Sequence, residues 1–253
     1  MIFWPDFTCK PENVLILPDI FMIRTMFFDL DDTLFDHQYS RRCGIMALKA
    51  MHQALSAADI RDMEKFHEQL IWANFTKILD GEISVYDAMT ERIRTLCARF
   101  GLTLAHADVP ETVRRYDAAY QNNRRAVPGS RELLALLKGE AQVGIITNGF
   151  CDLQEEKIAA CGISPLIDVL IISEEAGSTK PDRRIFETAL ARAEADPAES
   201  LYVGDSWNVD ILPASACGMK AVWLNRYRQP CPDPSLAREI TSYTGLDFRE
   251  LLE

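Results

Sequence analysis

Two aspartates that follow a short apolar run are the residues of this chain whose types and spacing point most directly to chemistry. The run Met26-Phe27-Phe28 precedes Asp29-Leu30-Asp31-Asp32-Thr33, and side chains two residues apart at a strand end project the same way. Two carboxylates held that close repel each other unless a shared proton or a bound cation neutralises them, and either arrangement implies chemistry. An alternative is a solvated loop, because Asp-rich turns are common after strands.

Three further groups of polar residues follow later apolar runs: Thr147-Asn148-Gly149, Lys180-Pro181, and the segment from Gly204-Asp205 to Asp210. The acids of the whole set supply the hard oxygen ligands that Mg²⁺ prefers: Asp29, Asp31, Asp205 and Asp210. Three other residues supply donors and a positive charge for phosphate: Thr147, Asn148 and Lys180. Each group alone is weak evidence, whereas the combination is specific.

The apolar runs before these groups predict the fold class. Strands are expected at residues 143–146, 169–172, 201–203 and 221–224, and helices between them at 152–160, 184–193 and 209–217. Strict alternation of strand and helix predicts an α/β fold, with a Rossmann-like parallel sheet covered by helices on both faces. Such sheets bind ligands at the carboxyl ends of their strands, where all four groups lie.

The segment after the first strand differs from the rest of the chain because it has helical patterns and no convincing strand. Its apolar stripes are Ile45, Leu48 and Leu55, and then Met89, Ile93, Leu96 and Phe100. An insertion at this point suits a lid over the site; the alternative is a helical domain without contact to it. We expect an α/β core of residues 23–36 and 126–253, an all-helical cap of residues 37–125, and a poorly specified extension of residues 1–22.

Composition narrows the range of partners. The net charge of -11 over 253 residues disfavours a nucleic-acid polymer, because phosphate neutralisation needs clustered Lys and Arg. A small anionic substrate stays compatible, since a lysine or a metal ion can override the global charge locally. The seven cysteines form no CxxC pair, which predicts reduced thiols in a cytoplasmic protein. No stretch has the length of a transmembrane helix, so no membrane association is expected.

The four groups, in this order, resemble the motifs of the haloacid dehalogenase-like (HAD) hydrolase superfamily over about residues 24 to 225. Those motifs are DxDxT, a Thr or Ser after the second strand, a Lys, and GDxxxxD. The stretches Gly144-Ile145-Ile146-Thr147-Asn148-Gly149-Phe150 and Ile172-Ser173-Glu174-Glu175-Ala176-Gly177 look most like the pyrimidine 5'-nucleotidases of the family.

The resemblance implies a role for each matching position. Asp29 is expected to attack phosphorus and form an aspartyl-phosphate, and Asp31 to protonate the leaving alcohol and then deprotonate water. An acid at position 31 favours phosphoryl transfer over dehalogenation, because a halide leaves without a proton.

The resemblance also implies a metal ion and a phosphate clamp. Mg²⁺ is expected to be held by Asp29, the backbone carbonyl of Asp31 and Asp205, with Asp210 acting through these ligands. The phosphate oxygens are expected to bind Thr147, Asn148 and Lys180, and Lys180 also offsets the acids.

These expectations define a leading function and two alternatives. The leading one is a Mg²⁺-dependent phosphomonoesterase that acts on a small phosphorylated metabolite, a pyrimidine nucleoside monophosphate. The second is a sugar-phosphate or phosphoglycolate phosphatase, or a phosphomutase, on the same core. The third is a catalytically silent phosphate-binding scaffold, which is disfavoured because none of the reactive residues is missing.

Overall fold

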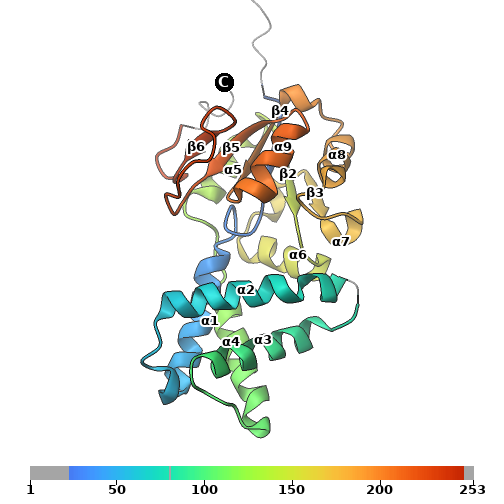
Figure 1. Ribbon diagram of the computed structural model, residues 1–253. Coiled ribbons are helices and arrows are strands. Elements are labelled where there is room, and N and C mark those ends of the chain that lie inside the picture. Colours follow the sequence, from blue (N-terminus) through green and yellow to red (C-terminus); the bar gives the residue numbers. More distant parts are fainter. Residues whose placement is uncertain (1–22, 80, 248–253) are drawn as a thin grey trace, which may run out of the picture.

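A single parallel sheet forms the centre of the protein (Figure 1). The structure, a computed structural model, describes residues 23–79 and 81–247; the predicted extension of residues 1–22 lies outside them. The strands are β1 (Thr25–Phe28), β2 (Gln142–Thr147), β3 (Val169–Ile172), β4 (Ser200–Gly204), β5 (Lys220–Leu224) and β6 (Arg238–Ile240). Their order is β3-β2-β1-β4-β5-β6, and every neighbouring pair is parallel. The predicted α/β fold is confirmed, with β6 as an edge strand that the sequence analysis missed.

Helices pack on both faces of this sheet. They are α5 (Ser130–Leu137), α6 (Cys151–Ala160), α7 (Ser173–Ala176), α8 (Arg183–Arg192) and α9 (Leu212–Ala216). Alternate residues of β1 enter opposite cores: Met26 and Phe28 join the core of α5, whereas Phe27 joins that of α8. A Cβ at Gly144, opposite Phe27 on β2, would lie 2.5 Å from the Phe27 ring. The glycine therefore makes room for this ring.

The inserted helices, residues 37–122, lie between β1 and β2 in the chain. They are α1 (His37–Met51), α2 (Ile60–Leu79), α3 (Val85–Arg99) and α4 (Val109–Asn122), and the described residues of this segment form no strand. Ile45, Leu48, Ile93 and Leu96 are fully buried in their common core. Leu55, expected on the same helical stripe as Ile45, lies instead in a short 3₁₀ turn, Gln53–Leu55. The inserted helices form a second lobe on the side to which β1 runs (Figure 1).

The two chain segments that join the lobes lie side by side. Asp36 N–H donates to Arg125 O at 3.0 Å, and Val127 N–H donates to Leu34 O at 2.8 Å. The Asp36 carboxylate is buried and accepts from Arg125 at 2.7 Å and from Arg226 at 2.9 Å. Arg226 follows β5, so one carboxylate binds both connecting segments to the sheet lobe.

The last predicted helix differs most from expectation. Instead of one helix over 209–217, a π-helical turn at Trp207–Ile211 precedes α9.

The six described cysteines carry free thiols: Cys43, Cys97, Cys151, Cys161, Cys217 and Cys231. Within residues 23–79 and 81–247, no helix is both long and apolar enough to span a bilayer.

Candidate active site

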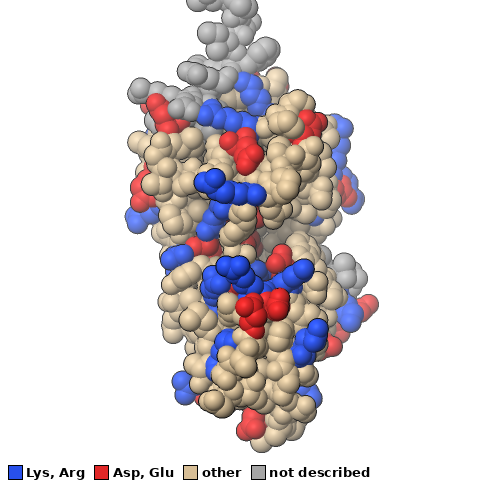
Figure 2. Space-filling view, turned by 60° about the vertical axis from the view of Figure 1, so that its left-hand side comes forward, with Lys and Arg blue, Asp and Glu red and all other residues tan. Residues whose placement is uncertain are grey.

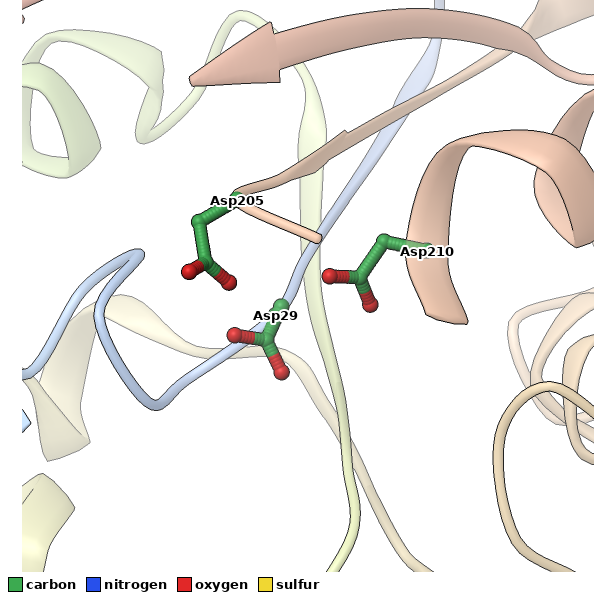
Figure 3. A group of neighbouring side chains, drawn as sticks. All are labelled: Asp29, Asp205 and Asp210. Atoms are coloured by element: carbon green, nitrogen blue, oxygen red, sulfur yellow. The ribbon is translucent and has the colours of Figure 1, made fainter. Parts of the chain in front are cut away.

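Asp29 follows β1 directly, and its side chain is buried. Its backbone N–H donates to Val203 O of β4 at 2.9 Å, which fixes the residue at the centre of the sheet edge. One oxygen each from Asp29, Asp205 and Asp210 lie within 4.8 Å of one another, and the three carboxylates converge (Figure 3). The structure thus brings together three of the four predicted acids.

Lys180 is the cation of this group. Its buried Nζ lies 2.5 Å from Asp29 Oδ1, 2.7 Å from Asp210 Oδ1 and 3.0 Å from the Tyr202 hydroxyl. An ammonium has three donors, and these three acceptors match them. Lys180 therefore binds the nucleophile candidate and the last acid of the sequence set at the same time.

Asp210 is held by protein donors on both carboxylate oxygens. Oδ1 accepts from Lys180 and Tyr202, and Oδ2 accepts from Ser206 N–H at 3.1 Å. Its side chain presses on the end of β4, where a Cβ at Gly204 would lie 2.5 Å from Asp210 Cβ. A glycine is needed there because any larger residue would displace the carboxylate.

Asp205 lies between these groups and the surface. Its backbone carbonyl accepts from Trp223 Nε1 at 2.8 Å, and the Trp223 ring packs edge-on against Trp207 at 5.3 Å between centroids. Two indoles thus fix the backbone from which the Asp205 carboxylate projects.

The electrostatics of the cluster favour a bound cation. Burial raises the pKa of Asp29 to about 7, although Lys180 opposes that shift. The pKa of Asp205 is raised well above its usual range, mainly by burial and then by the charges of Asp29 and Asp32. Burial lowers the pKa of Lys180, but Asp210 and Asp29 outweigh it and raise that pKa overall. One ammonium among three acids, of which Asp29 and Asp210 are buried and Asp205 is half-buried, leaves the cluster short of positive charge.

The donor set fits a hard divalent ion. Carboxylate oxygens at this spacing are the ligands that Mg²⁺ takes, together with water and substrate oxygens. Asp29 and Asp205 are the acids best placed to hold it, since both Asp210 oxygens already accept from protein donors. The indirect role expected for Asp210 stays a prediction.

Asp31 binds partners different from those of the acid cluster. Its carboxylate accepts from Lys157 Nζ at 2.7 and 2.9 Å and from Gln154 Nε2 at 3.3 Å, and His37 Nδ1 lies 3.8 Å away. Burial alone would raise the pKa of Asp31, but the positive charge of Lys157 lowers it overall. The two motif acids thus occupy different environments, and a cation beside Asp29 would lower the raised pKa of that carboxyl and favour the charged form that attacks.

Thr147 is the last residue of β2 and Asn148 follows it, beside these residues. Thr147 Oγ1 accepts from Gln154 Nε2 at 2.5 Å. The Asn148 side chain pairs with the backbone of Lys180, donating to its carbonyl at 2.9 Å and accepting from its N–H at 2.8 Å. Asn148 therefore positions Lys180, and its predicted contact with phosphate stays a prediction.

Four contacting residues were absent from the sequence-derived set: His37, Gln154, Lys157 and Tyr202. Gln154 and Lys157 lie three residues apart on α6, so one helix face aims both at Asp31. That spacing is visible in the sequence, but the target is not. Tyr202 reads as an ordinary core residue of β4, and only the fold brings its hydroxyl to Lys180.

Known proteins resemble this chain in sequence and in structure. A family model described as haloacid dehalogenase-like hydrolase matches residues 23–218. The pyrimidine 5'-nucleotidase YjjG of Escherichia coli (strain K12) is 29% identical over 82% of this chain and 88% of its own. A glyceraldehyde 3-phosphate phosphatase of Pyrococcus abyssi (strain GE5 / Orsay) is 31% identical over 80% and 81%. The crystal structure of the HAD-hydrolase YfnB from Bacillus subtilis, bound to magnesium, superposes with a TM-score of 0.67 at 21% identity, covering 91% and 97%.

Proposed function

The chain belongs to the haloacid dehalogenase-like hydrolase family, and we propose that it is a Mg²⁺-dependent phosphomonoesterase that works through an aspartyl-phosphate at Asp29. The observation that carries the proposal is the contrast between its two motif acids. Asp29 lies in a buried acid cluster that Lys180 and a metal ion can neutralise, whereas Asp31 turns toward Lys157 and the inserted helices. One acid is placed to attack and the other to transfer protons.

In the first step, Asp29 attacks phosphorus while Asp31 donates a proton to the leaving oxygen. Lys180 holds the nucleophile in one orientation and offsets charge on the transferring oxygens. In the second step, Asp31, now a base, takes a proton from the water that attacks the aspartyl-phosphate. Lys157 and Gln154 keep the Asp31 carboxylate in place for both transfers.

Asp29 and Asp205, with the backbone carbonyl of Asp31, are the groups that we propose to hold Mg²⁺. When bound, the ion supplies positive charge that lets an anionic nucleophile approach an anionic phosphate. The magnesium bound to YfnB supports this assignment. Thr147 completes the proposed phosphate site with its hydroxyl.

We further propose that the inserted helices form a cap over this site. His37 of α1 lies 3.8 Å from Asp31, and its Nδ1 is 2.9 Å from the Tyr120 hydroxyl of α4. Helices at both ends of the insertion therefore reach the proposed acid. Their place at the carboxyl ends of the strands suits control of substrate entry.

We also propose a cytoplasmic location, for which free thiols are expected.

For substrate, we propose pyrimidine nucleoside 5'-monophosphates, on the strength of the core motifs and of the likeness to YjjG. A three-carbon sugar phosphate is the second candidate, because the glyceraldehyde 3-phosphate phosphatase of Pyrococcus abyssi is similarly related.

Phosphate release from UMP, CMP, glyceraldehyde 3-phosphate, phosphoglycolate and a hexose phosphate, with Mg²⁺ and with EDTA, tests both levels of the proposal. We expect Mg²⁺-dependent release, highest in kcat/KM for a pyrimidine nucleotide. A tenfold preference for a sugar phosphate would show that the proposed substrate class is wrong. If no ester released phosphate, the proposed phosphomonoesterase activity would be wrong.

A further inference from the structure

Three buried nitrogen atoms of the inserted helices have no hydrogen-bond partner among the described residues: Arg41 Nε, Arg92 Nε and His67 Nδ1. Glu64 Oε1, the further such atom of these helices, forms an ion pair with Arg42 at 3.1 Å. Arg41 is only 4% exposed and His67 only 1%. Buried polar groups are normally satisfied, so an unpartnered group needs an explanation. These three come from α1, α2 and α3, and therefore from three different helices of the insertion.

The three side chains are close enough to act on one another. After burial, the charges of Arg92 and Arg41 are the main cause that lowers the pKa of His67. The His67 ring stacks on Tyr116 at 5.4 Å, and its Nε2 lies 3.0 Å from the Tyr116 hydroxyl. When Nε2 accepts from that hydroxyl, Nδ1 carries the proton and becomes a third donor.

The same group lies toward the proposed active site. Arg41 follows His37 by four residues on α1, so the two side chains lie on one face of that helix. His37 in turn lies 3.8 Å from Asp31, the residue that we assign to the leaving group. Other Lys and Arg side chains gather on the surface where the two lobes meet (Figure 2). Arg41 therefore lies on the helix face that reaches the proposed acid.

Protein carboxylates neutralise this group only in part. Glu68 Oε2 lies 3.4 Å from Arg41 Nη2 and is half exposed, and Glu64 pairs with the exposed Arg42. For Arg92, no ion pair with another described residue is formed, and its strongest electrostatic neighbours are Tyr116, Tyr120 and Arg41. A desolvated guanidinium is costly without an acceptor. Guanidinium groups only donate, so the missing ligand group is an oxygen acceptor.

We propose that Arg41, Arg92 and His67 form a specificity subsite that recognises an oxygen acceptor on the leaving group of the substrate. The inference rests on the proposed function, because it places the phosphate at Asp29. Two substrate groups share the required chemistry: a carboxylate, and the ring carbonyl of uracil or thymine. Cytosine carries an amine donor where uracil and thymine carry a carbonyl, so this subsite selects against it.

Two matched substrate pairs test the subsite on the unaltered enzyme. UMP and CMP differ in the acceptor at one ring position, and phosphoglycolate and ethyl phosphate differ in a carboxylate. We expect at least one pair to show a preference in kcat/KM of about tenfold or more for the acceptor-bearing member. The pair that discriminates identifies the acceptor. Equal use of the two members in both pairs would overturn the subsite.

Variants then assign the preference to these residues. Arg41→Met and Arg92→Met should lower kcat/KM for the preferred substrate by about tenfold to hundredfold, while phenyl phosphate, which has no acceptor on its leaving group, changes less than threefold. Arg92→Lys should retain part of the preference. The controls are Arg42→Met and Arg94→Met, because both residues are exposed neighbours on the same helices.

The controls also separate the two proposals. A variant that loses phenyl phosphate hydrolysis in parallel with the preferred substrate, while keeping the wild-type melting temperature, would contradict a specificity role. Absence of hydrolysis of every ester by the wild-type enzyme would instead count against the phosphomonoesterase itself. The subsite proposal fails only when hydrolysis is present and discrimination is absent or unaffected by Arg41 and Arg92.

Discussion

Lys157 Nζ lies 2.7 Å from Asp31 Oδ2 and 2.9 Å from Oδ1, so one ammonium bridges both oxygens of the proposed acid. Lys157 comes from α6, and its Nζ lies 5.6 Å from the centre of the Phe35 ring. This contact restricts the conformation of the Lys157 side chain. Proton transfer requires a fixed carboxylate, and this contact fixes it from the sheet lobe.

Lys157→Met should impair esters with poor leaving groups more than activated ones. Without Lys157, Asp31 keeps the weaker contact with Gln154 and the 3.8 Å approach of His37, and proton donation to the leaving oxygen becomes less efficient. We expect kcat for a nucleotide or sugar phosphate to fall about tenfold more than kcat for p-nitrophenyl phosphate. Lys138→Met, at an exposed lysine, is the control. Equal losses on both kinds of ester would remove Lys157 from this role.

Asp29→Asn and Asp31→Asn should fail in different ways. Asp29→Asn has no nucleophile, so substrate binds without forming a phosphoenzyme. Asp31→Asn still attacks p-nitrophenyl phosphate, whose leaving group scarcely needs a proton, but lacks the base for the second step. We expect a rapid burst of p-nitrophenolate and a mass increase of one phosphoryl group on the peptide that holds Asp29. A burst in Asp29→Asn, or a phosphoryl group on Asp31, would reverse the assigned roles.

Removal of divalent ions should abolish turnover, and Mg²⁺ should restore it. Ca²⁺ should restore little, because it takes more ligands at longer distances and misaligns the nucleophile. Asp205→Asn should raise the Mg²⁺ concentration that gives half-maximal activity, since it replaces a charged ligand by a neutral one. Titration of activity with each ion measures both effects. Full turnover in excess EDTA would exclude the proposed metal site.

His67 should make the protein less stable in mild acid. Burial, with Arg92 and Arg41, holds its pKa well below the ordinary 6.5, so below pH 6.5 the unfolded chain binds a proton that the folded chain does not. The free energy of unfolding then falls as the pH falls. His67→Gln should remove this contribution, about 1.4 kcal/mol per pH unit below pH 6.5.

Urea unfolding of both proteins at pH 7.5 and pH 5.5 measures the difference. His106→Gln is the matched control, because His106 is exposed. An identical loss of stability on acidification in the wild type and in His67→Gln would show that His67 titrates normally in the folded protein.

The strands and the four motif groups could be predicted because each depends on local pattern. An apolar run followed by polar residues marks the end of a buried strand, and the predicted run 169–172 coincides with β3. Parallel pairing then places all four groups at one edge. Edge strand β6 was missed because its three residues, Arg238–Ile240, include two exposed charges and carry no apolar pattern.

The contacts within the site could not be predicted because they depend on side-chain direction between distant elements. The sequence suggests Asn148 as a phosphate ligand, but its amide is used by the backbone of Lys180, 32 residues away. The family resemblance gives Asp29 and Asp31 different roles, but nothing in the pentapeptide shows that α6 supplies the partners of Asp31. The π-helical turn at Trp207–Ile211 also has no marker in the sequence.

The adjacent connecting segments at Asp36 and Arg125 have a consequence for how such a protein can diversify. Because the chain leaves and re-enters the sheet lobe at neighbouring points, residues 37–122 can be exchanged as one block without cutting a strand. A chimaera that carries the corresponding helices of a relative, with Asp36, Arg125 and Arg226 retained, would keep the strand-end acids intact. In the proposed arrangement, substrate selectivity can therefore change within residues 37–122 while the reactive residues of the sheet lobe stay the same.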